Sequence, residues 1–89
     1  MARIAFSEMD NDEISVPAAT ADSLFGLGLL YSAGMDVEQD LVSAHKWFNL
    51  AALKGNDAAR DYRAEIASEM SSDEIAEAQR RAREWLHTH

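Results

Sequence analysis

Residues 24–56, LFGLGLLYSAGMDVEQDLVSAHKWFNLAALKGN, decide the fold because they hold two helical patterns separated by a glycine-containing turn. Before the turn, Leu24, Leu27 and Tyr31 recur at spacings of three and four residues, which is typical of a helix with one buried face. Gly34 then breaks the pattern, and glycine is the usual residue at a left-handed helix C-terminus. The sequence therefore predicts a helix over residues 18–33.

The second pattern follows directly after this turn. Its small and apolar residues share one helical face from about residue 38 to residue 54, and Gly55 with Asn56 ends the run. Phe48 belongs to this face and is predicted to lie in the core. The members of the face are Leu41, Ala44, Phe48, Ala51 and Ala52.

Two more helices are predicted in the C-terminal third of the chain. The first spans residues 57–70 and the second spans residues 72–86, with Ser71 and Glu74 forming an S-x-x-E capping box between them. Two predicted pairs of opposite charge four residues apart, Glu77 with Arg81 and Arg80 with Glu84, support the outer side of the last helix. The two predicted apolar faces are Ala59, Tyr62, Ile66 and Met70, and then Ile75, Ala78, Ala82, Trp85 and Leu86.

The fold class that follows is all-α, with about four helices. Turns this short force successive helices into antiparallel hairpins. Residues 1–17 lack a helical period and end at Pro17, so they are interpreted as an extended or mobile N-terminal arm. Within this arm Ile4 and Phe6 alternate with polar neighbours, and either a short strand or loose packing on the helices fits that pattern.

Glycines inside the first helix need a reason, because each one costs about 1 kcal/mol relative to alanine. Close helix contact is the interpretation for Gly28 and for Gly26. The small side chains of Ala44, Ala51 and Ala52 on the second helix provide a matching shallow surface. We therefore expect Gly28→Leu to be destabilising.

At this point the residues resemble the Sel-one-like repeat, a helical repeat related to the tetratricopeptide unit. The resemblance covers about residues 20–56, and residues 63–85 are more weakly similar to the closing hairpin of bacterial members. Asp36 departs from the pattern, since the family usually has a second glycine there. The residues that carry the resemblance are Leu27, Gly28, Leu29, Leu30, Tyr31, Gly34, Val37, Asp40, Ala44, Trp47, Phe48, Ala51, Ala52, Gly55 and Asn56.

The resemblance implies one full repeat over residues 18–56 and a closing helical hairpin over residues 57–89, stacked as in an α–α solenoid. It also implies a function in holding other proteins together, as an adaptor, scaffold or regulatory protein, and no chemistry. Its packing residues would be Leu27, Gly28, Gly34, Ala44, Phe48, Ala51, Ala52 and Gly55.

Composition excludes several partners. The chain has 89 residues, 16 acidic and 8 basic side chains and a net charge of −8, which repels nucleic acid and anionic membranes. No apolar stretch reaches the length of a signal peptide or a membrane span. Cysteine is absent, which suits a reducing compartment, so a cytoplasmic location is expected.

Catalytic and metal-binding patterns are also weak, so we expect no enzyme activity, cofactor or metal. The G-x-G at Gly26 and Gly28 lacks the third glycine and the preceding strand of a nucleotide loop. The acidic runs 10–13 and 36–40 lack the glycine and glutamate of a calcium loop. His45 has no second ligand at metal-binding spacing, so it is interpreted as a surface or rim histidine.

A small helical body cannot bury all of its aromatic side chains, and aromatics in a helical groove are typical binding anchors. The predicted partner-binding residues are Tyr31, Trp47 and Tyr62, in a groove between the first and third helices. Trp47 fits either rim packing or partner contact. The expected partner is a protein or peptide, or a second copy in a homodimer. The alternative function is an acidic inhibitor that occupies a basic site on its target, which the net charge of −8 motivates.

Overall fold

The computed structural model describes residues 19–89, which form four α-helices and no strand. The predicted arm, including its possible strand at Ile4 and Phe6, lies outside the described residues. Each helix begins at a side chain that caps it, so the local sequence accounts for most of the boundaries.

Helix α2 spans Ala21–Ala33, three residues shorter at its start than predicted. Thr20 and Ser23 form a reciprocal capping box, in which each side chain accepts a hydrogen bond from the other residue's backbone amide. At the other end Gly34 has φ 71°, and its amide donates to the Leu30 carbonyl oxygen. The left-handed glycine C-cap predicted from the sequence is therefore confirmed.

Helix α3 spans Leu41–Leu53 and also starts three residues later than predicted. The Asp40 carboxylate accepts hydrogen bonds from the Ser43 amide and the Ser43 hydroxyl, which places the N-cap at Asp40. Before it, Asp36 has a positive φ of 61°. Aspartate tolerates this left-handed conformation better than most residues, so the turn closes without the second glycine of the repeat pattern.

Helices α4 and α5 span Asp57–Ala67 and Ser72–Thr88. Asn56 caps α4, and its side chain also donates to Asp22 in the first turn of α2. The capping box of Ser71 and Glu74 is present as predicted. Helix α4 ends three residues early, because the hydrogen bonds of residues 68–70 are those of a turn.

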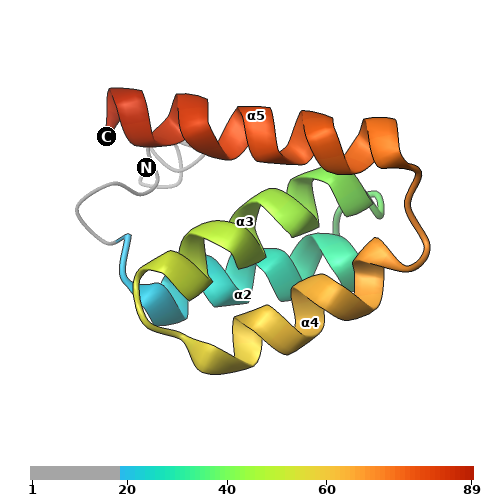
Figure 1. The fold of residues 1–89 in the computed structure, drawn as a ribbon. Coiled ribbons are helices and arrows are strands. Elements are labelled where there is room, and N and C mark those ends of the chain that lie inside the picture. Colours follow the sequence, from blue (N-terminus) through green and yellow to red (C-terminus); the bar gives the residue numbers. More distant parts are fainter. Residues whose placement is uncertain (1–18) are drawn as a thin grey trace, which may run out of the picture.

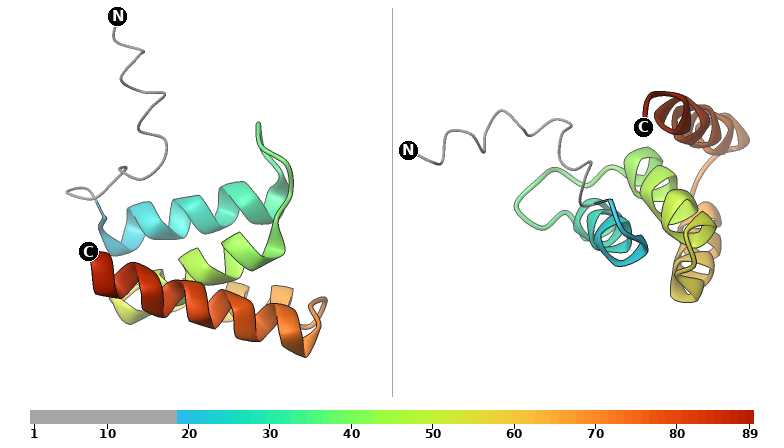
Figure 2. Two further views of the ribbon diagram at one scale, coloured as in Figure 1. Left: turned by 90° about the horizontal axis from the view of Figure 1, so that it is seen from above. Right: turned by 90° about the vertical axis from the view of Figure 1, so that its left-hand side faces the viewer.

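Successive helices run in opposite directions in Figure 1, and α3 occupies the middle of the arrangement. Figure 2 shows α3 between α2 on one side and α4 and α5 on the other. The extensive packing is between α3 and each of the other three helices, whereas α4 and α5 share few contacts. The two C-terminal helices are therefore held mainly by α3 and not by each other.

The core follows from this central position of α3. Most of its fully buried side chains come from α3, and single residues or small alanines from the other helices complete it. The predicted core residue Phe48 is fully buried. Leu50 is fully buried as well, although it lies outside the predicted apolar face. The core cluster is Leu24, Ala44, Phe48, Leu50, Ala51, Ala59 and Ala82.

Gly28 is buried against the Phe48 ring, and a methyl group placed on Gly28 would overlap two carbon atoms of that ring. The missing side chain therefore accommodates an aromatic ring of α3. Gly28 lies close against this helix as predicted, but the atoms nearest to it belong to Phe48 and not to the predicted alanines. Gly26 is different, since nothing lies within 4 Å of the position its Cβ would take. The interpretation of Gly26 as a close-contact residue was wrong, because a side chain at this position would extend into open space.

The other predicted packing residues divide by burial. Ala44 and Ala51 are fully buried, whereas Leu27 and Ala52 are partly buried at the margin of the core. Gly55 has φ 112°, a conformation that other residues rarely adopt, so its role is to end α3 and not to make a contact. Leu86 and Tyr62, predicted on apolar faces, are among the exposed large side chains.

Candidate protein-interaction surfaces

Three aromatic rings from three different helices form one cluster. Phe25 of α2 lies 5.7 Å from Phe48 of α3 and 5.2 Å from Tyr62 of α4, measured between ring centroids. Phe48 and Tyr62 are 5.6 Å apart. These separations are within the range in which aromatic pairs attract each other. The cluster therefore joins α2 to α4 across the buried Phe48 ring.

Tyr62 is the exposed member of this cluster. It is 41% exposed, although its ring packs edge-on against Phe25. Phe25 is only partly buried, so the two rings present apolar surface together between α2 and α4. Tyr62 therefore lies on α4 next to α2, the first and third of the predicted helices.

Trp47 points elsewhere. Its ring meets Trp85 of α5 edge-on at 6.0 Å, and the Lys46 ammonium lies 3.9 Å from its centroid. The Trp85 ring is in turn stacked on the His89 ring at 4.3 Å. Of the two interpretations of Trp47, the structure favours packing, because the ring belongs to the contact between α3 and α5.

Tyr31 is partly buried against the core near the end of α2. Among the described residues its ring packs against no other aromatic ring, in contrast to those of Tyr62 and Trp47. The backbone carbonyl of Tyr31 accepts a hydrogen bond from the Asp40 amide, which ties α2 to the start of α3. Tyr31, Trp47 and Tyr62 thus have different neighbours, and their contacts do not join them in one groove. Tyr62 is the most exposed of the three.

His45 contradicts its interpretation as a surface or rim residue. It lies on α3 and is only 4% exposed, and its Nδ1 atom has no hydrogen-bond partner among the described residues. Burial lowers the pKa of the imidazole, and the nearby positive charge of Arg63 lowers it further. Because α3 is covered on three sides, a position that looks peripheral on a helical wheel is enclosed.

This burial predicts a pH dependence of stability. In the unfolded chain the His45 imidazole takes up a proton near the ordinary histidine pKa of 6.5, whereas the folded protein lowers this pKa and keeps the ring neutral. The free energy of unfolding should therefore fall as the pH decreases below that value. Urea denaturation at several pH values should show a smaller loss between about pH 7 and pH 5 in His45→Gln than in the wild type.

The comparison between the two proteins isolates the contribution of His45, because His87 and His89 are exposed and unchanged in both. Parallel stability curves for the wild type and His45→Gln over this pH range would contradict the buried neutral imidazole.

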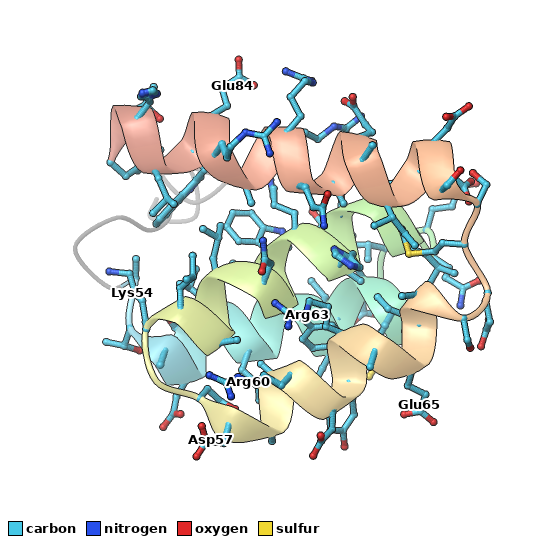
Figure 3. All side chains as sticks on the ribbon, viewed as in Figure 1. Lys54, Asp57, Arg60, Arg63, Glu65 and Glu84 are labelled. Carbon is cyan, nitrogen blue, oxygen red and sulfur yellow. The ribbon has the colours of Figure 1, made fainter. Side chains whose placement is uncertain are left out.

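A shallow depression lies beside α3 and α4. It is lined by Ala52 and Leu53 from the end of α3 and by Arg60 and Arg63 from α4. Figure 3 labels both arginines, together with Lys54 and Asp57 nearby in the chain. The Arg63 guanidinium donates a hydrogen bond of 2.6 Å to the side-chain oxygen of Asn49. Neither Arg60 nor Arg63 was predicted to belong to a site. They lie beside Leu53 only because α4 packs on α3, and the sequence alone does not show this packing.

The arginines of α5 are mostly engaged within their own helix. Arg80 and Arg81 both bind the Glu77 carboxylate, at 2.7 and 2.8 Å, and Arg80 also approaches Glu84. Hydrogen bonds from Arg80 and then from Arg81 lower the pKa of Glu77 to about 2. The predicted pairing of Arg80 and Arg81 with glutamates is confirmed, while Arg83 makes no such pair within residues 19–89.

Within residues 19–89, no three histidine, aspartate or glutamate side chains are placed to hold a metal ion. None of the four described helices is both long enough and apolar enough to cross a lipid bilayer. The acidic run 10–13 lies outside the described residues.

Comparison of the chain with models of protein families, with curated proteins and with solved structures found no match.

Proposed function

We propose that this chain is a non-enzymatic protein-interaction module of the Sel-one-like repeat type, which binds a polypeptide segment across α2 and α4. The observation that carries the proposal is Tyr62, which leaves 41% of its surface exposed while its ring packs against Phe25 and Phe48. A rigid aromatic ring that is partly exposed suits a binding anchor, because little side-chain entropy is lost when a partner covers it.

The residues that resemble the repeat support this proposal through their structural roles. Gly28 accommodates the Phe48 ring, and Gly34 ends α2 in the left-handed conformation. Asp36, where the family usually has a glycine, also has a positive φ. Alternating helix directions fit a stack of hairpins (Figure 1). In such a stack α2 and α4 would be equivalent first helices, and the face between them would be the binding groove.

Tyr62→Ala should weaken binding to the natural partner by about 1 to 2 kcal/mol without unfolding the protein. The ring is at the edge of its cluster, so its loss leaves Phe48 covered by Phe25. Trp47→Ala should instead lower the thermal stability, because Trp47 packs on Trp85. Titration calorimetry with the partner, combined with thermal melting of each variant, separates these two effects.

Tyr31→Ala serves as the matched control, since this tyrosine belongs to the same predicted set but lies outside the ring cluster. Equal affinity of the wild type and Tyr62→Ala for the partner would contradict binding across α2 and α4.

An acidic inhibitor is the second candidate, and one surface favours it. Asp61, Glu65 and Glu69 follow one another at intervals of four residues along the outer side of α4 and its following turn, and all three are exposed. Asp73 and Glu74 at the start of α5 are exposed as well. Such a row could occupy a basic site on a target protein. Under this alternative, association should slow strongly as salt is raised, and Tyr62→Ala should have little effect.

A further inference from the structure

Positive charge is scarce in this protein, and much of it is unpaired. Residues 19–89 contain twelve acidic and seven basic side chains. Two of the basic residues, Arg80 and Arg81, are bound by glutamates of their own helix. The remaining five form no ion pair with any residue in the described part of the chain. These are Lys46, Lys54, Arg60, Arg63 and Arg83.

Two of these unpaired cations meet at the depression beside α3 and α4. Arg60 and Arg63 are three residues apart, so they lie on neighbouring turns of one side of α4, and both line the depression. Asp57, one turn before Arg60, forms no ion pair with it. Arg63 is held by Asn49, and the rest of its guanidinium makes no hydrogen bond within residues 19–89.

The same depression offers apolar surface. Leu53 is 65% exposed, more than any other large hydrophobic residue in residues 19–89, and Ala52 beside it is only partly buried. Leu53 is the last residue of α3 and immediately precedes the helix C-cap at Lys54. An exposed leucine next to two unpaired guanidinium groups combines the two features that a short acidic and apolar peptide would recognise.

We propose that this depression binds an acidic peptide segment of a partner protein, with a carboxylate on Arg60 and an apolar side chain on Leu53. A guanidinium can bind a carboxylate through two parallel hydrogen bonds, which gives direction as well as affinity. Arg63, which is less exposed than Arg60 and is oriented by Asn49, provides a second positive charge in the lining of the depression.

The surrounding charge favours a short segment over a polyanion. Asp57, Asp61 and Glu65 are exposed on the same helix as the two arginines, and the whole chain carries a net charge of −8. A nucleic acid or an anionic membrane would place phosphates against these carboxylates as well as against Arg60. A peptide that carries few carboxylates can contact the arginines alone.

This depression is separate from the Tyr62 face. Arg60 and Tyr62 are two residues apart, and at about 100° per residue this places them on opposite flanks of α4. The inference therefore goes beyond the function proposed above and does not depend on it. Substitutions of Arg60 and Tyr62 can be tested independently.

The test uses fluorescence anisotropy with the full chain and a labelled synthetic peptide in which glutamate alternates with leucine. A matched peptide with glutamine in place of glutamate should bind more weakly. Arg60→Glu should weaken binding of the glutamate peptide about three- to tenfold, because it replaces attraction by repulsion at an exposed site. Leu53→Ser should also weaken it. Both positions are exposed, so each variant should fold, and circular dichroism is used to check this.

Arg83→Glu is the control, since Arg83 is unpaired and exposed on α5 and the charge change is identical. It should leave the affinity for the peptide within about twofold of the wild type. Three results would overturn the proposal: no binding of the glutamate peptide to the wild type, equal weakening by Arg60→Glu and Arg83→Glu, or loss of binding in Tyr62→Ala with none in Arg60→Glu. The last of these would assign the peptide to the Tyr62 face.

Discussion

Phe48→Ala should leave the protein largely unfolded at room temperature. Phe48 is fully buried and contacts rings from α2 and α4, so its removal opens a cavity at the point where three helices meet. Such a change costs about 3 to 5 kcal/mol, which is comparable to the whole stability expected for a domain of this size. Far-ultraviolet circular dichroism should show a marked loss of helix relative to the wild type.

Leu53→Ala is the matched control for this change, because it removes apolar side-chain carbons from an exposed position of the same helix. Its melting temperature should stay close to that of the wild type. A cooperative thermal transition for Phe48→Ala near the wild-type midpoint would contradict the central role of this ring in the core.

The second large effect is expected at Gly28. Gly28→Leu should cost about 1 to 3 kcal/mol or more, because any side chain there overlaps the Phe48 ring, which cannot move freely in a packed core. Gly28→Ala should also be destabilising, even though alanine favours the helix by about 1 kcal/mol. Chemical denaturation of each variant measures the cost directly.

Gly26→Ala provides the comparison within the same helix. The space around Gly26 is open, so alanine there should raise the stability by up to about 1 kcal/mol through helix propensity alone. The two alanine variants should therefore shift the denaturation midpoint in opposite directions. If both variants shifted the denaturation midpoint in the same direction and by a similar amount, the close contact between Gly28 and Phe48 would be contradicted.

The number and order of the described helices could be predicted from the sequence, because each helix has a strong end signal. Gly34 and the pair of Ser71 and Glu74 act locally, and both have the predicted conformation. The starts of α2 and α3 were each predicted three residues too early, because their N-caps were not recognised. The capping box of α2 has Ser23 where glutamate is usual. Asp40, which was predicted to lie inside α3, is its N-cap and accepts a hydrogen bond from the Ser43 amide.

Burial on α3 could not be predicted in the same way. A helical wheel assumes one buried face, whereas α3 packs against three helices, so its enclosed surface extends well beyond the Phe48 side. This is why His45 and Leu50 are buried although neither belongs to the predicted face. The sequence of α3 alone does not indicate how many helices pack against it.

The candidate binding residues show the same limit. Tyr62 belonged to the predicted set, but its ring contacts with Phe25 and Phe48 depend on how α2 and α4 approach each other. Trp47 resembles Tyr62 in type and yet packs on Trp85 from α5. Which aromatic ring stays exposed is decided by tertiary contacts that lie outside each helix's own sequence.

The central claim is that this chain works by binding another protein across α2 and α4. Quantitative affinity purification from the native source with wild-type, Tyr62→Phe and Tyr62→Ala baits tests it most directly. A specific protein should be enriched with the wild-type and Tyr62→Phe baits, which both keep the ring, and depleted with Tyr62→Ala. Recovery of the same proteins in the same amounts with all three baits would contradict the claim.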